Sequence, residues 1–292
     1  MSRVLACVVT GYGINADEEL ALAFRMAGAE ARRVHAGDLV ADPRQLGGFD
    51  ILALPGGFSF GDHLGSGKVL AHLFRRSLRP ALEEFVASGG LVIGVCNGFQ
   101  VLVKMGLLPN LSSRWEPEVS LVHNESGVFE DRWVRVVFDP ASPCVWTRGL
   151  EAMDVPVRHG EGRFVAAEPV LAELEAAHLA AVRYVRRDGG AGPAPYPENP
   201  NGSTDGIAGI TDRTGRVFGL MPHPEAFLFA ENHPEWTRGH GWPEVGRDRD
   251  VERPTRPEHA RRSRSFPRRG RGGGDGLAIF RTGVRAARST GS

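Results

Sequence analysis

The chain has 292 residues, of which 41% are hydrophobic and 24% are charged, an ordinary composition for a soluble globular protein. Its formal net charge of +0 at pH 7 gives no reason to expect a nucleic acid or an anionic membrane as a partner. No apolar run is long enough to span a bilayer, and no signal-peptide pattern opens the chain, so we expect a cytoplasmic protein. The three cysteines, Cys7, Cys96 and Cys144, are odd in number and far apart, unlike a disulfide framework or a zinc site. We therefore expect no metal site.

The first half of the chain alternates short apolar runs with helical patterns. These predict strands at residues 4–10, 31–35, 50–54 and 91–95, and helices from Asp17 to Gly28, over about 78–87 and from Phe99 to Gly106. Strands and helices in alternation build βαβ units. We therefore predict an α/β protein with an open, mostly parallel sheet that is flanked by helices.

The second half is richer in β-strands. Short strands are predicted at residues 120–123, 133–138, 155–159, 179–185, 207–211 and 217–221, and this half is expected to extend the sheet. Two turn-rich segments, 158–163 and 199–203, are expected near the functional site. Residues 236–274 are rich in arginine, proline and glycine, which predicts a flexible insert in a single domain that covers residues 1–292. A closing helix is predicted at 277–287.

The residues from Gly94 to Gly98 have the pattern of a nucleophile elbow, with cysteine in the place of serine. They lie between a predicted buried strand and a predicted helix, and glycines two residues on either side of Cys96 permit a sharp turn. The turn would hold the sulfur at a helix N-terminus, where free N–H groups and the dipole favour the thiolate. Cys96 is therefore the predicted nucleophile; the alternative is a buried structural cysteine.

A nucleophilic cysteine needs a base, and His223 and Glu225 follow the last predicted strand, with a proline on either side of the histidine. In an extended segment residues i and i+2 point to the same face, so Glu225 can orient one imidazole nitrogen and leave the other for Cys96. A structural ion pair is the alternative for this motif taken alone. We interpret the other histidines, His159 among them, as structural.

Acyl chemistry also requires donors for an oxyanion. The elbow supplies the backbone N–H of Asn97, and the loop after the third strand supplies a second donor, most simply Gly57. Glycine accepts either peptide orientation, so our hypothesis includes an oxyanion hole that opens and closes by a backbone flip.

Several stretches resemble the class I glutamine amidotransferases, and in particular the glutaminase subunit of phosphoribosylformylglycinamidine synthase, an enzyme of purine biosynthesis. They are residues 11–19, the loop 55–62 that reads Pro-Gly-Gly-Phe-Ser-Phe-Gly-Asp, the elbow with Gln100 behind it, residues 219–225, and residues 276–280 of the closing helix. This resemblance implies a flavodoxin-like fold over nearly the whole chain.

The resemblance also implies an activity. Cys96 would attack the carboxamide of glutamine to give a glutamyl thioester and ammonia, water would then release glutamate, and Gln100 would help to hold the α-groups of the substrate. The implied partner is the large synthetase subunit, which converts formylglycinamide ribonucleotide to the amidine and carries ATP and magnesium. No cofactor is then expected in this chain, and a small accessory subunit is left open.

Two alternatives remain, one a second enzyme activity and the other a different class of protein. A cysteine peptidase or deglycase-like enzyme of the same superfamily would draw its histidine from just after the elbow, but Asn97 stands there and no histidine follows before His123. A non-catalytic binding subunit is the second alternative, and the intact Cys96, His223 and Glu225 argue against it.

Overall fold

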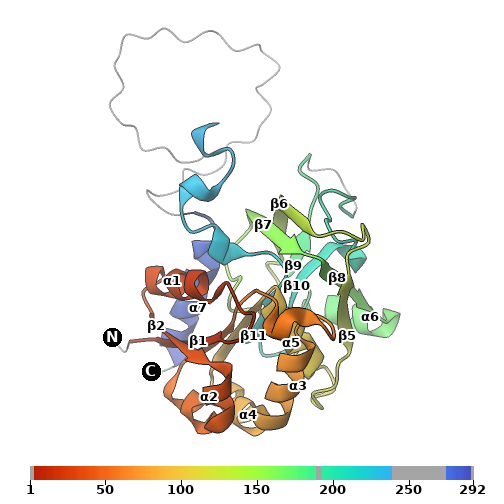
Figure 1. Ribbon diagram of the computed structural model, residues 1–292. Helices are drawn as coiled ribbons and strands as arrows, with labels where there is room; N and C mark the ends of the chain where they lie inside the picture. The colour runs from red at the N-terminus through yellow and green to blue at the C-terminus, as the bar shows by residue number, and fades with distance from the viewer. Residues whose placement is uncertain (1–2, 189–192, 239–273, 291–292) are drawn as a thin grey trace, which may run out of the picture.

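The computed structural model describes residues 3–188, 193–238 and 274–290 (Figure 1). Within these residues, a nine-stranded sheet has the strand order β2-β1-β3-β4-β11-β10-β9-β6-β7. Its strands are β1 (Leu5–Thr10), β2 (Glu30–His35), β3 (Ile51–Leu54), β4 (Leu91–Val95), β6 (Glu130–Phe138), β7 (Ala152–His159), β9 (Val182–Tyr184), β10 (Ile207–Thr211) and β11 (Val217–Leu220). A separate antiparallel pair joins β5 (Val119–His123) to β8 (Glu161–Ala166).

The large sheet is parallel in one half and antiparallel in the other. β2, β1, β3, β4 and β11 pair in parallel, and β10, β9, β6 and β7 continue the sheet as antiparallel strands. β3, β4 and β11 are buried along their whole length, as expected of strands that are covered on both faces. The predicted α/β fold, with a β-rich second half that extends the sheet, is confirmed.

Helices cover both faces of the parallel half (Figure 1). α1 packs against α7 on one face, whereas α3 packs against α4 and α5 on the other. The helices are α1 (Asp17–Met26), α2 (Ala36–Ala41), α3 (Lys68–Ser77), α4 (Arg79–Ala87), α5 (Asn97–Met105), α6 (Glu168–Ala176) and α7 (Leu277–Thr290). Short 3-10 turns are η1 (Pro43–Gly48), η2 (Ser59–Asp62), η3 (Thr204–Gly206), η4 (Pro224–Ala226), η5 (Ala230–Asn232) and η6 (Trp236–Arg238). Within the described part of the chain, each helix is too short or too polar to traverse a bilayer.

The structure contains elements that the sequence patterns did not predict. Helices α2, α3 and α6 are additional, and α6 buries only Leu174, so its sequence carries little apolar periodicity. Strand β8 overlaps the segment 158–163, which was predicted to be turn-rich. A Cβ on Gly162 would lie only 2.6 Å from Nδ1 of His159, so this glycine leaves room for the ring of the last residue of β7.

The predicted insert at 236–274 lies mostly outside the described residues, which resume at Gly274. There the backbone N–H of Gly274 donates to the carbonyl of Leu228 at 2.8 Å, just before α7 begins. The assignment of residues 1–292 to a single domain stays a prediction.

Candidate active site

Cys96 stands between β4 and α5 in a conformation that is rare for a residue with a side chain. Its backbone has φ 49° and ψ −105°, and its N–H donates to the carbonyl of Leu220 on the neighbouring strand β11 at 2.8 Å. Residues other than glycine seldom adopt positive φ, and such strain is found preferentially at functional sites. The sharp turn that was predicted for the elbow is therefore present.

The two glycines of the elbow let backbone segments pass close to one another. A Cβ on Gly98 would lie 2.0 Å from the carbonyl oxygen of Leu54, and a Cβ on Gly94 would lie 2.6 Å from the carbonyl oxygen of Gly98. Any side chain at these positions would separate α5 from strands β3 and β4. The pattern Gly-x-Cys-x-Gly is thus explained by the packing of the helix on the sheet.

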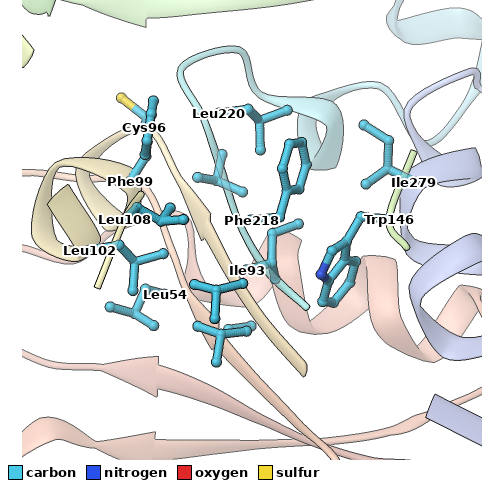
Figure 2. Close-up of a cluster of buried hydrophobic side chains, with 14 of the residues drawn as sticks. Leu54, Ile93, Cys96, Phe99, Leu102, Leu108, Trp146, Phe218, Leu220 and Ile279 are labelled. Atoms are coloured by element: carbon cyan, nitrogen blue, oxygen red, sulfur yellow. The ribbon is translucent and has the colours of Figure 1, made fainter. Parts of the chain in front are cut away.

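The sulfur of Cys96 lies at the border of the hydrophobic core. Figure 2 shows it pointing away from the core side chains of Phe99 and Leu102, although Cys96 as a whole is only 5% exposed. The thiol faces the carbonyl oxygen of Arg158, with a sulfur–oxygen distance of 3.7 Å. Its surroundings are therefore polar on one side.

The other two cysteines have no such setting. Burial raises the pKa of Cys7 to about 12 and the pKa of Cys144 to about 11, so both remain thiols at neutral pH. Both side chains are fully enclosed in the core. This agrees with the interpretation of Cys7 as a core residue.

His223 and Glu225 form a buried pair just after β11. The Nδ1 atom of His223 lies 2.6 Å from Oε1 of Glu225, and their side chains are 7% and 2% exposed. The sequence pattern predicted this pair from an extended segment, but Glu225 lies in the 3-10 turn η4, and the turn brings the carboxylate back to the imidazole. The pairing follows the prediction, whereas the local conformation differs from it.

The imidazole of His223 and the side chain of Cys96 both lie close to Gly56. A Cβ on Gly56 would lie 2.7 Å from Cε1 of His223 and 3.5 Å from Cβ of Cys96. Burial opposes protonation of His223, but the carboxylate of Glu225 and the sulfur of Cys96 outweigh it and raise the pKa of His223 to about 10. The structure thus brings together the predicted nucleophile, base and orienting acid, with Nε2 of the imidazole left for the reacting groups.

Gly57 lies in a loop that is fixed by a second glycine-bearing loop. The N–H of Phe58 donates to the carbonyl of Gly13 at 2.8 Å, and the N–H of Ala16 donates to the carbonyl of Gly56 at 3.3 Å. These bonds do not use the N–H of Gly57. Its φ of +142° is accessible to glycine alone, which agrees with the requirement for glycine here.

Asn97 and Gln100 take part in a buried network at the start of α5. The side-chain amide of Asn97 donates to Oε1 of Gln100 at 3.0 Å and to the carboxylate of Asp62 at 3.3 Å, and its oxygen accepts from the N–H of Ser59 at 3.2 Å. Nε2 of Gln100 donates to the carbonyl of Glu161. Because Asn97 begins α5, its backbone N–H has no acceptor within the helix. The oxyanion roles of Gly57 and Asn97 and the substrate role of Gln100 stay predictions.

The end of β7 also borders the site, and Pro156 there was not singled out by the sequence analysis. The carbonyl of Pro156 accepts from the N–H of His223 at 2.8 Å, and Arg158 faces the sulfur of Cys96 as described above. The turn-rich segment 158–163 was expected near the site, and it is there. The segment 199–203 packs behind it, where Asn201 donates to the carbonyl of Gly162 at 2.8 Å.

Within residues 3–188, 193–238 and 274–290, no group of three or more histidine, cysteine, aspartate or glutamate side chains is arranged to hold a metal ion. Several polar groups around Cys96 are hydrogen-bonded to one another or to backbone carbonyls, whereas the buried Nε2 of His223 has no hydrogen-bond partner within these residues. The sulfur of Cys96, the imidazole of His223 and the carboxylate of Glu225 can act as a nucleophile with a neighbouring acid–base group.

Comparisons with known proteins agree with this architecture. A model of the CobB/CobQ-like glutamine amidotransferase domain matches residues 3–251, so the chain belongs to the class of glutamine amidotransferases. Phosphoribosylformylglycinamidine synthase subunit PurQ of Dehalococcoides mccartyi is 44% identical over 236 residues, which cover 81% of this chain and 90% of the relative. The PurQ subunit of Methanococcus maripaludis is 43% identical over 230 residues, covering 78% and 84% of the two chains.

Solved structures show the same relationship. The structure of PurLQS from Thermotoga maritima has a TM-score of 0.58 and 32% sequence identity, and the match covers 77% of this chain and 89% of that one. The chain belongs to the PurQ family of glutamine amidotransferases.

Proposed function

We propose that this chain is the glutaminase subunit of a phosphoribosylformylglycinamidine synthase. The observation that supports it best is the buried pair of His223 and Glu225, 2.6 Å apart, beside Cys96 in a chain of the PurQ family. The reaction is the hydrolysis of L-glutamine to glutamate and ammonia through a thioester on Cys96.

In the first half-reaction, the sulfur of Cys96 attacks the carboxamide carbon of glutamine. At that moment the proton of Cys96 lies on Nε2 of His223, so the sulfur attacks without its proton. The carboxylate of Glu225 favours this charged form of the ring. As the C–N bond breaks, the nitrogen takes this proton and leaves as ammonia. The acyl group remains on the sulfur as a thioester.

In the second half-reaction, water attacks the thioester carbon and gives a proton to Nε2 of His223. The C–S bond then breaks and glutamate leaves. The sulfur of Cys96 is free again, with the proton on Nε2 of His223. Both tetrahedral intermediates carry a negative oxygen. We assign the backbone N–H groups of Asn97 and Gly57 as its donors, because one begins a helix and the other is not used by the bonds that fix its loop.

The ammonia is consumed by a partner. The relatives are named as subunits of phosphoribosylformylglycinamidine synthase, so we propose a large synthetase subunit that converts formylglycinamide ribonucleotide to formylglycinamidine ribonucleotide. ATP and magnesium would bind to that partner, and glutamine is the small-molecule substrate of this chain. The cytoplasmic location, the absence of a cofactor in this chain and a small accessory subunit stay predictions.

A comparison of the wild type with Cys96→Ala tests this function. Each is combined with the synthetase subunit, and formylglycinamidine ribonucleotide is measured with glutamine or with ammonium chloride as the nitrogen source. We expect the variant to lose glutamine-dependent synthesis while ammonia-dependent synthesis persists. Full use of glutamine by Cys96→Ala would refute the role of the nucleophile, and a wild type that never uses glutamine would refute the function.

A further inference from the structure

His159, the last residue of β7, is a buried histidine without a role in the steps above; it is 3% exposed. Its Nδ1 lies 3.1 Å from Oδ1 of Asn124. The amide nitrogen of Asn124 donates to the carbonyls of Val128 at 2.9 Å and of His159 at 2.7 Å. These two bonds fix the orientation of the amide, so its oxygen must face the imidazole.

This contact determines which nitrogen of His159 carries the proton. Because Oδ1 of Asn124 can only accept, Nδ1 of His159 is the donor, and Nε2 of the neutral ring is left with a lone pair. Burial, and then the charge of His223, lower the pKa of His159 to about 3, so the ring stays neutral throughout the physiological range. His159 therefore offers one fixed hydrogen-bond acceptor.

That acceptor has no partner within the described residues. The Nε2 atom of His159 is buried and makes no hydrogen bond there, and the same is true of Nε2 of His223. A buried polar atom without a partner is unfavourable, so native proteins seldom retain one without a reason. Nε2 of His159 is an acceptor, whereas Nε2 of His223 is a donor when its ring is charged.

The two histidines are held near each other by β7. The carbonyl of Pro156 binds the N–H of His223, the carbonyl of Arg158 faces the sulfur of Cys96, and His159 is the next residue along the strand. Gly162 lies against the ring of His159, so the ring has little room to turn away. His159 is thus held at the same end of β7 that borders Cys96 and His223.

We propose that Nε2 of His159 accepts a hydrogen bond from the carboxamide nitrogen of the substrate and from the ammonia that it becomes. The nitrogen of an amide can bond to both of these Nε2 atoms. It can donate one N–H to His159 while it receives the proton of His223 as the C–N bond breaks. His159 would thereby orient the leaving nitrogen and favour an amide over an ester. This assignment rests on the proposed glutaminase function.

An amide and an ester of the same acid separate this role from a structural one. Glutamine can donate to His159, whereas the ester oxygen of L-glutamate γ-methyl ester has no hydrogen to donate. We expect His159→Met to lower kcat/KM for glutamine about tenfold or more, the usual consequence of losing a buried hydrogen bond. Hydrolysis of the γ-methyl ester should change by less than about threefold, within the context dependence of such contacts. The assays use the chain with its synthetase subunit.

Two further variants complete the design. His159→Gln carries an amide oxygen that can stand near the position of Nε2, so it should recover much of the preference for glutamine over the ester. His178→Met is the matched control, because His178 is half-exposed and pairs with Asp139 at 2.8 Å on another part of the surface. It should leave the ratio of the two rates unchanged.

A spectroscopic measurement needs no substitution at His159. In the Cys96→Ala variant with ¹⁵N-labelled histidine, saturation with glutamine should move the Nε2 resonance of His159 in the direction of a hydrogen-bonded acceptor. Equal loss of amide and ester hydrolysis in His159→Met, or a His159 resonance that does not move, would overturn the proposal. If the wild type hydrolyses glutamine in the same assays, the proposed function stands independently of that result.

Discussion

The imidazole of His223 is held by the carboxylate of Glu225 through a contact of 2.6 Å between Nδ1 and Oε1, and both side chains are almost completely buried. The carboxylate determines which nitrogen faces the reacting groups, and it favours the charged form of the ring against the effect of burial. Orientation and protonation of the base therefore depend on the same contact.

Substitution of Glu225 by glutamine should lower the pKa of His223. Burial lowers that pKa, whereas the carboxylate of Glu225 and the sulfur of Cys96 together raise it from 6.5 to about 10, and loss of the carboxylate removes the largest of the effects that raise it. We expect the titration midpoint of His223 in a ¹⁵N-histidine spectrum to move to lower pH, and kcat for glutamine to fall by about 10²–10⁴-fold. A midpoint that stays near that of the wild type would contradict this account.

The same pair has a consequence for the pH dependence of stability. Since the pKa of His223 is raised in the folded state, its stabilising contribution is complete below about pH 6.5 and is lost as the pH rises towards 10. The difference in free energy of unfolding between the wild type and Glu225→Gln should therefore be largest below pH 6.5 and shrink above it. Urea unfolding at a series of pH values measures this difference.

Gly56→Ala should damage catalysis while the protein still folds. The new Cβ would lie 2.7 Å from Cε1 of His223, so the ring must shift, whereas the backbone of Gly56 is not in the left-handed region. Misplacement of a catalytic group by about 1 Å can lower the rate about 10²-fold. Gly47→Ala is the control, because a Cβ there meets nothing within 4 Å. Equal kcat in the two variants would show that Gly56 does not set the position of the imidazole.

Gly283→Ala tests the packing of α7 on the core. Alanine is favoured over glycine within a helix by about 1 kcal/mol. However, the Cβ would lie 2.2 Å from the ring of Trp146, which is fully buried and donates from Nε1 to the carbonyl of Arg216 at 3.1 Å. Overpacking typically lowers the free energy of unfolding by about 1–3 kcal/mol, so we expect net destabilisation. A variant that is more stable in urea than the wild type would show that Trp146 can move.

Alkylation should distinguish the three cysteines. Burial raises the pKa of Cys7 to about 12 and of Cys144 to about 11, so neither should react with iodoacetamide in the folded protein at pH 7.5. We expect peptide mass spectrometry to find label on Cys96 alone, and three labelled cysteines after denaturation. Label on Cys7 or Cys144 in the native protein would be inconsistent with the enclosed core.

The elbow could be predicted because its determinants are contiguous in sequence. A buried strand, two glycines around Cys96 and a following helix describe one local turn, and the strained backbone at φ 49° is what that pattern requires. The pairing of His223 with Glu225 was also predicted from spacing, although the extended conformation that was assumed is replaced by a 3-10 turn. Short spacing limited the distance between these groups in either conformation.

The features that were not predicted depend on contacts between distant residues. The tautomer of His159 is set by Asn124, 35 residues earlier in the chain, and no local pattern carries that information. Gly162 suggested a turn, but it lies in a strand where a ring occupies the space of a side chain. Leu174 is the one buried residue of α6, so the helix lacks the apolar stripe by which helices are identified.

The nucleophile and the base follow two adjacent parallel strands, since β4 pairs with β11 and Leu220 lies opposite Val95. The separation of the strand ends that carry them is therefore fixed by the ladder in the middle of the sheet, whereas Gly56 and the end of β7 position the imidazole. Warming that frays the periphery should leave this geometry intact until the central ladder itself melts. Heat inactivation and loss of the sheet should then occur as a single event.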